Sequence, residues 1–325
     1  MAPAVARQRL LALLVGLACV ALLSVLVERR AGDDGSGEAQ LTASATLVGN
    51  PATRLVPAST EYGAPTVRPL PPESRIVGFA GAPQSPELGI LGDIGLERGA
   101  DRLAIQSRPY QRKTRPVTRI FDLIATVADA HEGRSGLYRT RQKPATIERW
   151  LRAARRNDAL LMLDIQPGGS NFVDETRALY RWLKEPDVHL ALDPEWRMRP
   201  GVAPGSEIGY VSHGELQVTL DRVAGLIKRA QLPPKLVVVH RFTDGMIKDL
   251  AKVKVPKGII GVISIDGVGV KAEKIATYKR IAPHLPKPWR PGFKLFFQED
   301  AAAGGLMSGK QVMALQPRPS VVLYE

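Results

Sequence analysis

Two carboxylates stand two residues apart in the segment Asp193-Pro194-Glu195-Trp196, which follows a short apolar run. On a strand they would project to the same side, where one carboxylate raises the pKa of the other, as a general acid near neutral pH needs. Pro194 can bend the chain here, which leaves this pairing open. Trp196 would offer an aromatic face on which a sugar ring stacks, although a purely structural place, packed among the strands of the fold, is equally consistent with a tryptophan here.

Other polar residues also follow apolar runs. Asp164 and His240 stand at the ends of two such runs, and Asp266 ends a third. Taken singly, each acid can be a helix N-cap or a turn former. His240 could orient or protonate a substrate, help to bind a metal, or simply hydrogen-bond to a neighbouring acid. Because the histidines form no HxxxH or HExxH spacing, the sequence predicts no metal site.

The elements that position these residues are short apolar runs alternating with amphipathic stretches, which is typical of βαβ units. Strands are predicted over residues 76–80, 117–126, 160–166, 188–193, 236–242, 259–266, 293–298 and 321–324. Helices are predicted over residues 93–110, 146–157, 173–183, 214–230, 271–281 and 310–315. This number of strands predicts an α/β fold, a closed (β/α)8 TIM-type barrel over residues 75–325. A doubly wound open sheet is the alternative, but Gly78-Phe79-Ala80-Gly81 lacks the spacing of a phosphate-binding turn.

The period of two along each strand predicts which side chains face the lumen, and in such barrels active sites lie where the strands end. The predicted catalytic residues are Glu195, Asp193 and Asp164. The predicted substrate-binding residues are Asp122, Gln166, Trp196, His240, Asp266, Gln298, Asp300 and Tyr324. No cofactor is predicted: residues 304–310 match GxxxxGK, but Gln311 stands where a Ser or Thr would hold magnesium.

The N-terminal region predicts export and attachment to a membrane. Basic residues precede an apolar run over residues 10–27, which is long enough to cross a bilayer and lacks a nearby cleavage site. We therefore expect a signal anchor over residues 1–30, a disordered Gly-, Ala-, Ser-, Thr- and Pro-rich stalk over 31–74, and an extracellular C-terminal domain. Because Cys19 is the only cysteine, disulfides within the domain are excluded. The alternatives to an uncleaved signal anchor are a lipid anchor at Cys19 and secretion of the domain.

The charge leaves several partners open. The chain carries 45 Lys and Arg against 32 Asp and Glu, a formal net charge of +13. Nucleic acid, anionic lipid or an acidic wall polymer would each attract such a chain. Because no basic stripe is interleaved with aromatic residues, nucleic acid is not the expected partner. The expected partners are the membrane, through the N-terminal helix, and a polysaccharide or cell-wall ligand.

Three segments carry a resemblance to a family of exported, often lipoprotein-like actinobacterial proteins, and the likeness runs from about Gly78 to the end of the chain. They are Leu161-Met162-Leu163-Asp164-Ile165-Gln166-Pro167-Gly168, Leu190-Ala191-Leu192-Asp193-Pro194-Glu195-Trp196-Arg197-Met198 and Val239-His240-Arg241-Phe242-Thr243-Asp244-Gly245-Met246-Ile247. The resemblance implies a place in the cell envelope and no particular reaction. More distantly, Asp193-x-Glu195 is similar to strand ends of chitinase-like and lysozyme-like barrel glycoside hydrolases. His189 and apolar residues replace the acids that precede this pair in the chitinase-like pattern.

Three functions fit these observations. The first is a cell-envelope carbohydrate-active barrel, a glycoside hydrolase with Glu195 as general acid and Asp193 or Asp164 as its partner. The second is a non-catalytic barrel that binds wall glycan or a partner protein through the same residues. The third is a metal-dependent hydrolase that uses Asp164, Asp193, Glu195 and His240.

Overall fold

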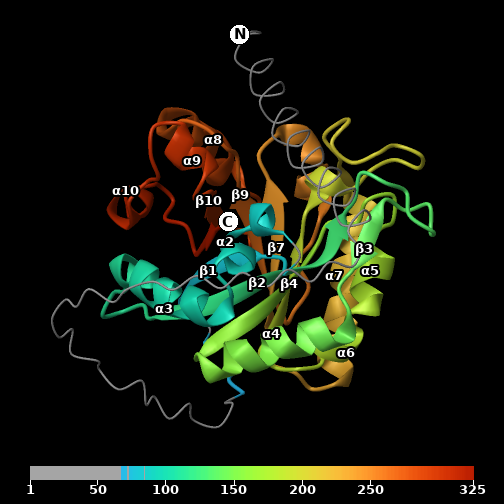
Figure 1. Ribbon diagram of the computed structural model, residues 1–325, viewed down its shortest axis with the longest axis horizontal. Coiled ribbons are helices and arrows are strands. Elements are labelled where there is room, and N and C mark those ends of the chain that lie inside the picture. The colour runs from blue at the N-terminus through green and yellow to red at the C-terminus, as the bar shows by residue number, and fades with distance from the viewer. Residues whose placement is uncertain (1–66, 72, 84) are drawn as a thin grey trace, which may run out of the picture.

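The structure is a computed structural model that describes residues 67–325 except 72 and 84. A nine-stranded sheet dominates it, and all of its strands except β3 run parallel in a closed ring, because β1 pairs with both β2 and β11. The barrel strands are β1 (Arg75–Gly81), β2 (Val117–Ala128), β4 (Ala159–Ile165), β5 (Val188–Leu192), β7 (Lys235–Arg241), β9 (Ile259–Ile265), β10 (Arg290–Leu295) and β11 (Val321–Tyr324). The predicted (β/α)8 barrel is confirmed (Figure 1).

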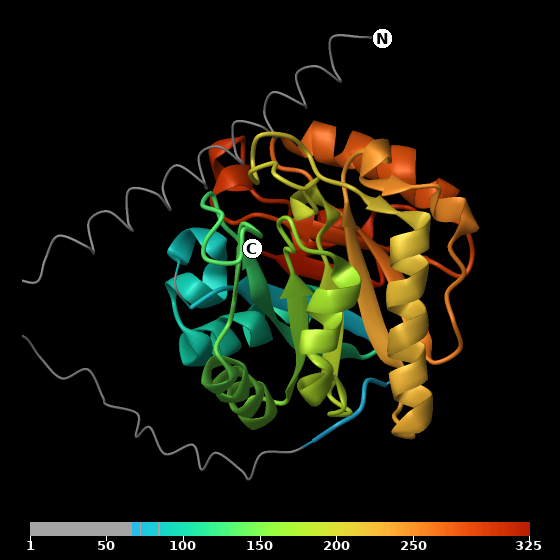
Figure 2. The same ribbon diagram turned by 90° about the vertical axis from the view of Figure 1, so that its right-hand side faces the viewer.

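Helices lie around the outside of this ring (Figure 2). They are α2 (Ile90–Asp93), α3 (Leu96–Ser107), α4 (Pro144–Arg156), α5 (Phe172–Ala178), α6 (Tyr180–Leu183), α7 (His213–Arg229), α8 (Lys271–Ile281), α9 (Glu299–Ala302) and α10 (Gly309–Met313). In α4 the buried residues Ile147, Trp150, Leu151 and Ala154 recur at helical spacing and turn one face to the strands. The helix predicted over residues 173–183 is divided at Leu179 into α5 and α6.

Short elements complete the fold. Three minor strands are β3 (Arg139–Arg141), β6 (Val211–Ser212) and β8 (Ile247–Lys248). Single 3-10 turns are η1 (Pro86–Leu88), η2 (Arg108–Tyr110), η3 (Pro194–Trp196), η4 (Asp244–Met246), η5 (Leu250–Lys252) and η6 (Ala282–His284). β3 pairs antiparallel with the last three residues of β2 and is not part of the barrel ring.

Two apolar layers follow from the alternation of side chains along each strand. In β4, Leu161, Leu163 and Ile165 belong to the large cluster between strands and helices, whereas Leu160 and Met162 belong to a smaller cluster inside the barrel. That inner cluster fills the N-terminal part of the lumen and leaves the C-terminal end to polar residues. It includes Leu70, so the last residues of the predicted stalk are part of the folded barrel.

The other N-terminal predictions fall mostly outside the described residues. The apolar run over 10–27 and the stalk up to residue 66 lie there, so the structure leaves both as predictions. None of the helices in the described part of the chain has the length and hydropathy that crossing a bilayer requires.

Candidate functional site

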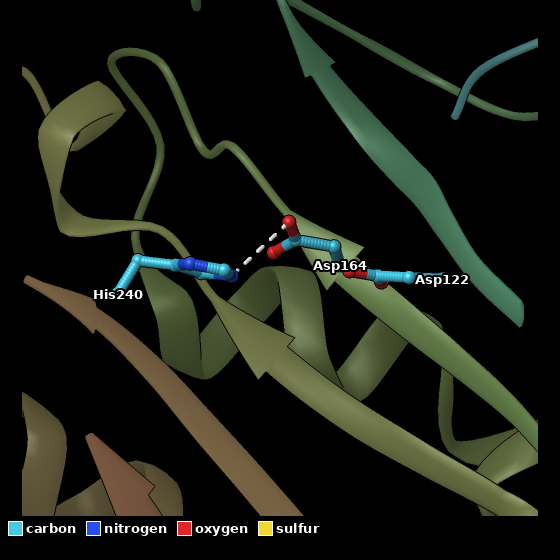
Figure 3. A group of neighbouring side chains, drawn as sticks. All are labelled: Asp122, Asp164 and His240. Atoms are coloured by element: carbon cyan, nitrogen blue, oxygen red, sulfur yellow. Dashed lines mark ion pairs between the residues drawn. The ribbon is translucent and has the colours of Figure 1, made fainter. Parts of the chain in front are cut away.

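Asp122, Asp164 and His240 meet inside the barrel (Figure 3): Asp122 lies in the middle of β2, and Asp164 and His240 lie near the C-terminal ends of β4 and β7. All three side chains are buried, and His240 Nε2 lies 3.6 Å from Asp164 Oδ2. One oxygen from each acid and one ring nitrogen of the histidine all lie within 4.8 Å of one another. Strands far apart in the sequence therefore bring these three predicted residues together.

Asp266 holds the histidine ring from behind. It follows the last residue of β9; its Oδ2 lies 2.5 Å from His240 Nδ1, and its Oδ1 accepts a hydrogen bond from Ser264 Oγ at 2.7 Å. Burial lowers the pKa of His240, but the carboxylates of Asp266 and Asp164 outweigh it and raise that pKa to about 10. Burial raises the pKa of Asp266, yet His240 overrides this and the pKa is lowered, so the two form an ion pair.

The Asp193–Glu195 segment departs from the predicted strand. β5 ends at Leu192, and Pro194 begins the 3-10 turn η3, in which Asp193 Oδ1 accepts a hydrogen bond from the Glu195 amide at 3.2 Å. The prediction that both acids project from one strand is therefore wrong. Their charges still interact: burial and then Asp193 raise the pKa of Glu195 well above its ordinary value. Burial also raises the pKa of Asp193 to about 7.

A lysine balances part of this negative charge. Lys294 on β10 forms a buried ion pair with Glu325, which directly follows β11. Burial lowers the pKa of Lys294, but Glu325, Asp266 and Asp193 outweigh burial and raise it well above the ordinary value. The predicted site residues include neither Lys294 nor Glu325, and Glu325 was missed because the last strand was predicted to end at Tyr324. We call the whole group the acidic rim: Asp122, Asp164, Asp193, Glu195, Asp266 and Glu325, with His240 and Lys294.

Tyr324 lies elsewhere. Its ring packs in the outer apolar layer, stacked on Phe297 with centroids 5.2 Å apart and edge-on to Phe79. Its hydroxyl lies 2.5 Å from that of Tyr110. The predicted inward orientation of Tyr324 is wrong, because Leu323 belongs to the inner cluster and the alternation then places Tyr324 outside.

Four other predicted residues have different surroundings. Gln166 accepts a hydrogen bond from the Ala128 amide at 3.2 Å, which joins the ends of β4 and β2. Asp300 accepts one from the Phe296 amide at 3.0 Å and pairs with Lys274 at 3.1 Å. Gln298 is exposed at the start of α9, and Trp196 is partly buried in η3. Gln166 and Asp300 thus contribute to local structure at the edge of the rim.

The arrangement can do two kinds of chemistry. Acids with raised pKa values beside ionised ones can donate and accept protons, and the converging oxygens and ring nitrogen can bind a cation. A scan of the sequence against models of protein families finds no match, and a search of curated proteins finds no similar sequence.

Proposed function

We propose that this chain is a carbohydrate-active hydrolase of the cell envelope in which Glu195 is the general acid and Asp193 or Asp164 is its carboxylate partner. The observation that carries the proposal is the meeting of these acids at the end of the adjacent strands β4 and β5. Hydrolysis of a glycosidic bond needs two carboxyl groups, one protonated to release the leaving group and one to act as base or nucleophile.

The electrostatics support a division of roles. Glu195 has the strongly raised pKa that a proton donor needs at neutral pH, and Asp193, with a pKa of about 7, is partly ionised there. Asp266 stays ionised beside His240. Acids whose surroundings move their pKa values apart are the usual basis for assigning acid and base.

The surroundings of Glu195 support a sugar as ligand. Glu195 and Trp196 are both partly exposed in η3, so the indole could stack on a sugar ring next to the proton donor. Tyr324, buried in the outer layer, has no part in this proposal. The envelope location rests on the predicted anchor over residues 1–30.

The test uses the full chain with purified cell-wall polysaccharides and measures newly released reducing ends. We expect Glu195→Gln to lower the rate by about 10²–10⁴-fold, the usual contribution of a general acid. Asp193→Asn and Asp164→Asn identify the carboxylate partner of Glu195. The variant that lacks this partner should lose most of the cleavage activity, and the other should keep most of it. Glu207→Gln is the matched control, because Glu207 pairs with Arg199 on the protein surface.

Two outcomes would count against the proposal. If cleavage by Glu195→Gln and Asp193→Asn equals that of the wild type, the assignment of these residues is wrong. If the wild type binds glycan but releases no product, the chain is a binding barrel and the rim holds its ligand without cleaving it.

A further inference from the structure

The deepest part of the acidic rim has polar atoms without partners. Both carboxylate oxygens of Asp122, Oδ1 of Asp164 and Nε2 of His240 are buried and have no hydrogen-bond partner among the described residues. The exposed fractions of these three residues are 0, 2 and 1%. An unpartnered buried polar group costs free energy, and a cluster of four such atoms therefore needs a physical explanation.

Protonation alone does not provide that explanation. A protonated carboxyl group is a hydrogen-bond donor and needs an acceptor, and neither oxygen of Asp122 has one. The nearest interaction, between His240 Nε2 and Asp164 Oδ2 at 3.6 Å, is an ion pair too long for a hydrogen bond. The three side chains gather at one point, and one ligand atom from each lies within 4.8 Å of the other two (Figure 3).

The spacing of these atoms suits a metal ion. Bonds from Zn²⁺ to histidine nitrogen or carboxylate oxygen are about 2.0–2.2 Å, so ligand atoms at tetrahedral angles on one ion stand about 3.3–3.6 Å apart. The three ligand atoms here lie within 4.8 Å of one another, and His240 Nε2 is already 3.6 Å from Asp164 Oδ2, so side-chain shifts of about 1 Å or less bring them to bonding distance.

The surroundings of His240 are those of a metal ligand. Asp266 holds Nδ1 of the ring and is itself held by Ser264, which leaves Nε2 directed at the two other acids. Histidine ligands commonly use their second nitrogen in this way, and the carboxylate behind the ring fixes its orientation. The nearby lysine, Lys294, pairs with Glu325, which offsets its repulsion of a cation.

We infer that Asp122, Asp164 and His240 bind one divalent transition-metal ion, with Zn²⁺ the best fit, and that Asp266 positions the histidine. The ring nitrogen favours Zn²⁺ over Mg²⁺ and Ca²⁺, which prefer ligand sets made of oxygen alone. The ion displaces the proton on Nε2 of His240, and the ring keeps its Nδ1 proton toward Asp266. Three protein ligands leave a coordination position for water or substrate. The inference does not depend on the proposed function; a bound ion would occupy Asp164 and leave Asp193 as the partner of Glu195.

The test measures metal binding by the full chain after removal of metal with a chelator. ZnCl₂ alone, in competition with a chromophoric chelator, should show one tightly bound ion per chain, and MgCl₂ should bind at least 100-fold more weakly. Asp122→Asn and His240→Gln should each weaken Zn²⁺ binding by about 100-fold or more, and Asp266→Asn by about 10–100-fold. His213→Gln is the matched control, because His213 lies 3.5 Å from Asp249 on the surface and should bind no Zn²⁺ of its own.

Thermal unfolding distinguishes a lost ligand from a lost fold. Asp122→Asn removes no hydrogen bond of the described structure, so the metal-free variant should unfold at or above the wild-type Tm. Zn²⁺ at 100 times its Kd should raise the Tm of the wild type by roughly 5–10 °C and leave that of Asp122→Asn unchanged.

Two results would overturn the inference: a wild type that binds no Zn²⁺ below about 100 µM, or variants of Asp122 and His240 that bind it as tightly as the wild type does. Glu195→Gln separates the two proposals, since it should bind Zn²⁺ normally whether or not it cleaves glycan.

Discussion

His189 should make the barrel sensitive to mild acid. It lies on β5 with no exposed surface, and its Nδ1 accepts a hydrogen bond from the Leu236 amide at 3.1 Å, so this nitrogen cannot carry a proton in the fold. Nε2 is buried without a partner among the described residues. Burial, and then the charge of Lys235, lower the pKa of His189 from 6.5 to about 3.

The sign and size of the effect follow from proton linkage. Below pH 6.5 the unfolded chain takes up a proton at His189 that the folded chain excludes, so stability is lost as pH falls from about 6.5 toward 3. Each pH unit in that range costs about 1.4 kcal/mol. Between pH 7 and pH 5 the free energy of unfolding should therefore fall by about 2 kcal/mol on account of this residue.

The assay compares urea unfolding of the wild type and His189→Asn at pH 7 and pH 5. Asparagine can accept the Leu236 hydrogen bond with its side-chain oxygen but does not titrate, so its loss on acidification should be about 2 kcal/mol smaller. The variant should also be less stable at pH 7, because it leaves a cavity where the ring was. Equal losses in the two proteins would refute the reasoning, since all other titrating groups are common to both.

Two further substitutions test other parts of the structure. Glu175→Gln should lower the free energy of unfolding by about 3–5 kcal/mol, because the buried carboxylate pairs with Arg139 at 3.0 Å and Arg141 at 2.7 Å; a Tm within 2 °C of the wild type would contradict this. Tyr324→Phe should cost about 1 kcal/mol by removing the hydroxyl contact with Tyr110. Tyr324→Phe should bind glycan with the same affinity as the wild type, measured by calorimetry. A weaker affinity would show that Tyr324 takes part in glycan binding.

The fold was readable from the sequence because each barrel strand is an apolar run bounded by turn residues. All the predicted strands are present, and the barrel closes through β1 as the strand number implied. β3 was missed, since Arg139-Thr140-Arg141 is short and polar and exists only through its pairing with β2. Long-range pairing of this kind leaves no local pattern in the sequence.

The site was readable only where polar and apolar residues alternate. In β4 the alternation of Leu161, Leu163 and Ile165 with Met162 and Asp164 fixes the inward face, and the structure agrees. The final run Val321–Tyr324 is apolar throughout, so nothing in it fixes the phase, and Tyr324 was assigned to the wrong side. At Asp193 the strand ends before the pair of acids is complete, because Pro194 lacks the N–H that a continuing strand would use.

Stability does not account for the acidic rim. Buried ion pairs such as Lys294–Glu325 and His240–Asp266 roughly balance the cost of desolvating their charges, and the unpartnered oxygens of Asp122 are a net cost. The two apolar layers already provide the burial that holds the barrel closed. Apolar residues at Asp122 and Asp164 would extend the inner layer to the barrel mouth and remove that cost. A barrel that instead keeps several acids there forgoes stability, and that is expected where the acids bind or transform a ligand.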